Sequence, residues 1–80
     1  MRVDGFVFYI YQNDHRLAHV HVCRAGAWCT IRLGDGDEPP SLLEQGEMRP
    51  IDARRAVWLA AGSWELLLAQ WRKLHGQPDA

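Results

Sequence analysis

Three of the chain's four histidines lie within seven residues of one another, at positions 15, 19 and 21. His19 and His21 alternate with Val20 and Val22, and a period of two is typical of a strand with one buried face. The two imidazoles should therefore point together to the outer face of a sheet. Imidazoles placed in this way can titrate near neutral pH, bind a metal ion or transfer protons.

The segments that must position these histidines read as strands, followed by a helix. Aromatic and β-branched residues predict strands at about 6–11, 19–24 and 27–33. The sequence does not decide whether residues 41–44 form a short fourth strand at the edge of the sheet. Apolar residues then recur every three or four positions, which predicts a helix over about 52–75. The helix carries one apolar stripe, consisting of Val57, Ala60, Trp64, Leu67, Trp71 and Leu74.

These elements predict a single α+β domain over residues 1–80. In it, a small antiparallel sheet of three to four strands packs against a C-terminal helix. We favour one helix because its apolar stripe keeps phase across Gly62-Ser63, with a bend or a break near Gly62 as the alternatives.

A two-residue connection at Ala25-Gly26 predicts how the second and third strands pair. In that register the sheet separates into an apolar inner face and a polar and aromatic outer face, which a slip of one residue would mix. The inner face should carry Phe6, Phe8, Ile10, Val20, Val22, Cys29, Ile31 and Leu33. The outer face should carry Val7, Tyr9, Tyr11, His19, His21, Cys23, Trp28, Thr30 and Arg32. Since the two cysteines fall on opposite faces, we do not expect a disulfide between them.

Two kinds of chemistry suit the histidines. His15, His19 and His21 could bind a divalent metal such as zinc and leave one coordination position open. The same histidines with Tyr9 could instead act as acid and base, for example in RNA cleavage, with Arg32 stabilising the charge of the phosphorane.

A third reading is a binding face. Tyr11, Trp28 and Thr30 would contact a protein or stacked bases, with the histidines at the rim. A purely structural role also stays open, in which the segment 35–50 covers the histidines.

The predicted helix has a second basic and aromatic side. Arg54 and Trp58 are four residues apart, a spacing that suits a cation–π contact, and we count both as candidate binding residues. Because Trp58 lies off the apolar stripe, a contact with a partner protein or a homo-oligomer is also open.

Net charge and hydropathy bear on whether the chain binds nucleic acid or a membrane. The net charge is −1, so binding to nucleic acid would need a local basic patch. The sequence has no apolar run near 18 residues and no signal-peptide pattern, so we expect a cytoplasmic protein that does not contact the membrane.

The chain resembles the small bacterial and archaeal family catalogued as domain of unknown function 4160. The matching stretches are Asp4-Gly5-Phe6, Asn13-Asp14-His15, His19-Val20-His21-Val22 and the segment 64–71. Two stretches depart from the family pattern: Leu17-Ala18 replaces the usual Pro-Pro, and Ala61-Gly62-Ser63 stands where relatives have polar, helix-favouring residues.

The resemblance implies a genomic neighbourhood and does not imply a particular reaction. The family has no settled activity, and its genes often lie beside another small gene in what look like toxin–antitoxin pairs. It therefore implies a small protein partner encoded by a neighbouring gene, with nucleic acid as a further candidate partner. The expected function is a protein-binding component of such a pair, with a metal-dependent or metal-independent nuclease or hydrolase and a metal-binding module as alternatives.

Overall fold

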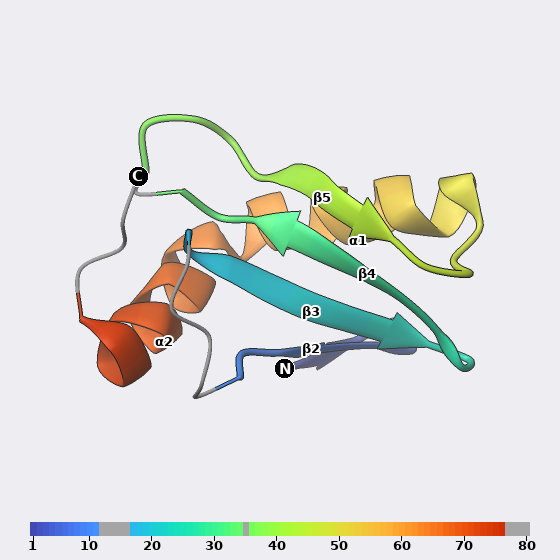
Figure 1. Cartoon of the computed structure of the whole chain (residues 1–80), viewed down its shortest axis with the longest axis horizontal. Helices are drawn as coiled ribbons and strands as arrows, with labels where there is room; N and C mark the ends of the chain where they lie inside the picture. Colours follow the sequence, from blue (N-terminus) through green and yellow to red (C-terminus); the bar gives the residue numbers. More distant parts are fainter. Residues whose placement is uncertain (12–16, 35, 77–80) are drawn as a thin grey trace.

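Antiparallel strands that follow one another along the chain form a single sheet, and two helices cover one of its faces (Figure 1). The computed structural model describes residues 1–11, 17–34 and 36–76. Within them the strands are β1 (Arg2–Val3), β2 (Phe6–Tyr9), β3 (His19–Arg24), β4 (Ala27–Arg32) and β5 (Ser41–Gln45). The helices are α1 (Pro50–Gly62) and α2 (Trp64–His75). The α+β class and the antiparallel sheet are as predicted.

The β3–β4 hairpin has the expected register. Ala25 and Gly26 form its turn, with φ angles of 50° and 82°, the left-handed conformation that two-residue hairpin turns require. His21 pairs with Thr30 and Cys29 with Val22. The inner face is therefore the apolar one, and it forms the core with both helices. The strand residues buried in that core are Phe6, Phe8, Val20, Val22, Cys29 and Ile31, and Leu33, which follows β4, is buried with them.

The number of strands differs from the prediction, because the described residues contain five strands and not three to four. β1 is only two residues long, too short for an alternating pattern, and it pairs with β2 across the Asp4-Gly5 turn. β5 is a full strand at the edge of the sheet, with a shift in register opposite Thr30 and Ile31. The strands predicted at 6–11 and 27–33 end earlier, at Tyr9 and Arg32.

The prediction of one helix over 52–75 was wrong, and the alternative break is what the structure shows. Ser63 has φ −117° and ψ 21°, so it leaves the helical path, and its N–H donates to the carbonyl oxygens of Leu59 and Ala60. The next residue, Trp64, anchors the start of α2, because its indole Nε1 donates a hydrogen bond to the carbonyl oxygen of Leu33 at 2.8 Å.

The change of direction also alters the buried stripe. Leu74 is 46% exposed, whereas Ala53, Ala56 and Leu68 are buried in the core although the sequence stripe omits them. No helix within the described residues is long and apolar enough to span a bilayer.

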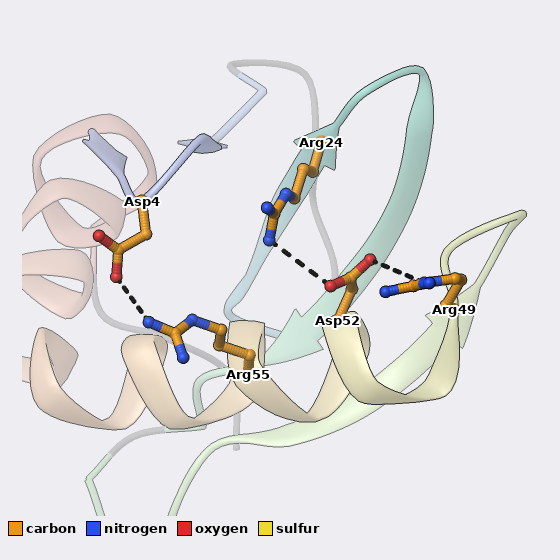
Figure 2. A network of polar contacts seen from close by, with 5 residues as sticks. All are labelled: Asp4, Arg24, Arg49, Asp52 and Arg55. Atoms are coloured by element: carbon orange, nitrogen blue, oxygen red, sulfur yellow. Dashed lines mark hydrogen bonds and ion pairs between the residues drawn. The ribbon is translucent and has the colours of Figure 1, made fainter.

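Ion pairs attach the start of α1 to the rest of the domain (Figure 2). Asp52 lies between two guanidinium groups, 3.5 Å from Arg24 Nη1 and 3.5 Å from Arg49 Nε. Arg24 also lies over the ring of Phe6, 4.8 Å from its centroid. A second pair joins Arg55 to Asp4 at 2.9 Å, with both side chains more than half exposed. Asp52 therefore couples β3 to α1 at a partly buried position.

We predict that Asp52→Asn lowers the free energy of unfolding by about 0.5–1 kcal/mol, because two ion pairs and a favourable charge in the first helical turn are lost. Asp4→Asn is the matched control: it removes one exposed pair and should cost less than about 0.5 kcal/mol. Urea titrations at low and high salt measure both changes, and the Asp52 effect should shrink in salt. An equal or larger cost for Asp4→Asn would contradict this account.

Candidate functional site

The face of the sheet that the helices leave uncovered, here called the open face, carries a cluster of aromatic rings. The ring of His21 stacks on that of Tyr9 with centroids 5.6 Å apart, and Tyr11 meets His21 edge-on at 4.4 Å. His19 lies beside His21, with ring centroids 5.2 Å apart. The predicted outer-face histidines and tyrosines are thus in mutual contact. Their grouping follows from strand alternation and from the Tyr9–His21 pairing of β2 with β3.

Helix α2 extends this cluster beyond the sheet, at the end where β3 begins (Figure 1). Trp71, which is 1% exposed, lies with its ring centroid 5.4 Å from that of His19. His75 packs on Trp71 at 4.1 Å, and its Nε2 lies 3.0 Å from the carbonyl oxygen of Tyr11. We call the whole set the ring cluster: Tyr9, Tyr11, His19, His21, Trp71 and His75.

The sequence did not place His75 at the site. The spacing of four between Trp71 and His75 would have shown that they share a helix face. It could not have shown that this face meets His19.

Hydrogen bonds hold the polar atoms of the cluster. The Tyr9 hydroxyl shares a hydrogen bond with Cys23 Sγ at 3.1 Å. The Tyr11 hydroxyl donates a hydrogen bond to the Tyr9 hydroxyl at 3.4 Å. The bond with Cys23, then the bond with Tyr11 and partial burial, raise the pKa of the Tyr9 hydroxyl well above its usual value. Tyr9 therefore stays a neutral phenol, suited to hydrogen bonding and not to acting as a base. His19 Nδ1 lies 2.7 Å from the carbonyl oxygen of Leu17, which orients that ring.

The candidates for metal binding and catalysis are only partly brought together. His19 and His21 are adjacent, while His15 lies outside the described residues. Within the described part of the chain, no three His, Cys, Asp or Glu side chains are grouped so as to hold a metal ion. Arg32 pairs with Glu38 at 3.7 Å and packs against Gly34, so a phosphate would have to compete with that carboxylate.

The predicted binding residues fall on two separate surfaces. Tyr11 and Trp28 lie on the open face, 48% and 41% exposed, and the Trp28 ring covers Gly46. Thr30 is 3% exposed, and its hydroxyl accepts a hydrogen bond from the amide of Glu44. The sequence predicts that Thr30 contacts a partner, but the structure buries it beside β5, where it pairs with Glu44.

Arg54 and Trp58 lie on α1, on the side of the sheet opposite Tyr11 and Trp28, and line the same shallow hollow. The spacing of Arg54 and Trp58 suits a cation–π contact, but the cation–π contact found among the described residues is between Arg24 and Phe6.

A family model described as Domain of unknown function (DUF4160) matches residues 5–72. The chain belongs to this family. The matched range covers β2 to β5, α1 and most of α2, so the DUF4160 match includes both strand histidines and Trp71 and ends before His75. No curated protein and no solved structure matches the chain.

The two cysteines of this DUF4160 chain should differ in reactivity. Burial raises the pKa of the Cys29 thiol from 9.0 to about 11, so its thiolate fraction falls about 100-fold. Cys23 is partly exposed on the open face.

We predict that a thiol-specific disulfide reagent at about pH 8 modifies Cys23 in the folded protein and modifies Cys29 only after denaturation. Cys23→Ser is the control and should show no rapid reaction while folded. Rapid labelling of folded Cys23→Ser protein would show that the β3–β4 register places Cys29 differently.

Proposed function

We propose that the chain is the protein-binding component of a toxin–antitoxin-like gene pair and that its open face recognises the partner. The observation that carries this proposal is the ring cluster, whose strand residues lie on the face of the sheet opposite the core and which leaves Tyr11 half exposed. Exposed aromatic rings held by their neighbours offer a large contact area at little entropic cost, and such residues dominate binding energy at protein interfaces. The paired-gene setting rests on the family resemblance.

The charges near the cluster favour a protein partner over nucleic acid. Arg32, the arginine paired with His19 across β3 and β4, is already in contact with Glu38. Phosphate binding depends on available cations, and the chain as a whole carries a net charge of −1. A partner that presents apolar groups and carbonyl oxygens fits the tyrosine rings and imidazoles better.

The test is binding to the product of the neighbouring gene. We expect Tyr11→Ala to raise the Kd about ten-fold or more, because the ring is lost without disturbing the core. Leu66→Ala is the matched control, since Leu66 is 51% exposed on α2 and lies outside the cluster; its Kd should stay within about two-fold. Calorimetric titration of one separately purified protein with the other measures both, and thermal melts confirm that each variant is folded. Binding that is unaffected by Tyr11→Ala would place the interface elsewhere.

One observation favours a second candidate, a hydrolase that uses acid–base chemistry. Helix α2 brings a third histidine, His75, close to the two strand histidines. His21 contacts His19, and Trp71 lies between His19 and His75 and contacts both. In acid–base cleavage of a phosphodiester, one imidazole acts as the general base and another acts as the general acid.

For this candidate we predict that purified protein cleaves RNA and that His21→Ala lowers the rate about 10²–10⁴-fold, the usual contribution of a general acid or base. Leu66→Ala should cleave like the parent. Repeating the assay with a chelator separates metal-dependent from metal-independent cleavage. If the parent and His21→Ala proteins show the same residual rate, the hydrolase candidate is rejected.

A further inference from the structure

The edge of the sheet at β5 is open to another strand. β5 pairs with β4 on one side, and within the described residues no strand lies along its other side. All five of its residues are exposed, including Leu42 at 40% and Leu43 at 45%. An edge strand with adjacent exposed leucines presents free backbone N–H and C=O groups together with an apolar surface.

An apolar groove runs alongside this edge, between β5 and α1. Its volume is about 650 Å³, and it is lined by β5 residues such as Leu42 and by Val57 and Trp58 of α1. Trp58 is 70% exposed and Ile51, seven residues earlier on the same helix, is 58% exposed. Large apolar side chains gathered beside an open edge mark an interaction surface.

The charges of α1 suggest what occupies the groove. Arg55 is paired with Asp4, and Asp52 with two other arginines, whereas Arg54 has no ion-pair partner among the described residues. The groove is therefore lined by a guanidinium that has no ion pair among the described residues and, one turn further on, by an exposed indole. A two-fold symmetric interface needs a self-complementary patch, and a cation together with an aromatic ring meets that need.

The spacing along both elements agrees with a two-fold axis. Ala56 is the central residue of α1, and Arg54 and Trp58 lie two positions to either side of it. An antiparallel copy of α1 centred there brings Arg54 of each copy opposite the partner's Trp58. Leu43 is likewise the central residue of β5, so two β5 strands that pair antiparallel about Leu43 oppose each other along their whole length.

We propose that the chain forms a homodimer in which the β5 strands of two copies pair antiparallel and their α1 helices pack beside each other. Arg54 of each copy lies over the partner's Trp58. The two sheets become one continuous sheet, and both open faces lie on the same side of it. The dimer would present two ring clusters to other partners, and the proposal does not rest on what those clusters bind.

The test is the mass of the full chain in sedimentation equilibrium from about 1 to about 200 µM, where we expect a species of about twice 9.2 kDa. Trp58→Ala and Arg54→Glu should each weaken dimerisation at least about ten-fold, because each removes one half of both cation–π contacts. Leu43→Lys is an independent variant on the strand and should have the same effect. Leu66→Ala is the control and should dimerise like the parent, with circular dichroism showing that all variants are folded.

Two outcomes would overturn the dimer. One is a parent chain that sediments as a monomer at every concentration. In that case, binding of a different protein that is lost in Trp58→Ala would assign the groove to a heterologous partner. The other is a dimer that Trp58→Ala and Leu43→Lys leave unchanged, which would place the interface away from β5 and α1.

Discussion

The register between β3 and β4 decides which side of the sheet every neighbouring side chain faces. It depends on a tight turn in which Ala25 and Gly26 both adopt positive φ angles. With this register Val22 and Cys29 lie together in the core, while His21 lies on the open face beside Tyr9. A shift of one residue would bury the imidazole and expose the valine, so the core and the ring cluster depend on the same pairing.

The position of α2 is the second constraint on the site. The helical path changes direction at Ser63, and the hydrogen bond from Trp64 to the Leu33 carbonyl anchors the new helix at the end of β4. Trp71 then fills the space beside His19, and His75 reaches the carbonyl of Tyr11. Without this change of direction His19 would lack its contact with Trp71 of α2. The site is therefore built jointly by the sheet and by a helix that begins more than forty residues after β3 begins.

The sheet also separates two surfaces of different character. The open face presents rings that are ordered by contacts with one another and by hydrogen bonds from Tyr9 and Tyr11. The edge at β5 presents backbone groups above the apolar groove that contains Trp58. The rings of Tyr9 and Tyr11 lie on the face of the sheet opposite α1, whereas the second surface includes α1 itself.

The sequence by itself determined the alternation of His19–Val22, the hairpin turn and therefore the assignment of residues to the two faces. These features depend on neighbours along the chain, whose period and turn residues can be read directly. Only the tertiary structure decided that Thr30 is covered by β5, that the helix breaks at Ser63, and that His75 joins the ring cluster. Each of these depends on contacts between segments far apart in the chain, such as Trp64 with Leu33, and periodicity within one segment carries no information about them.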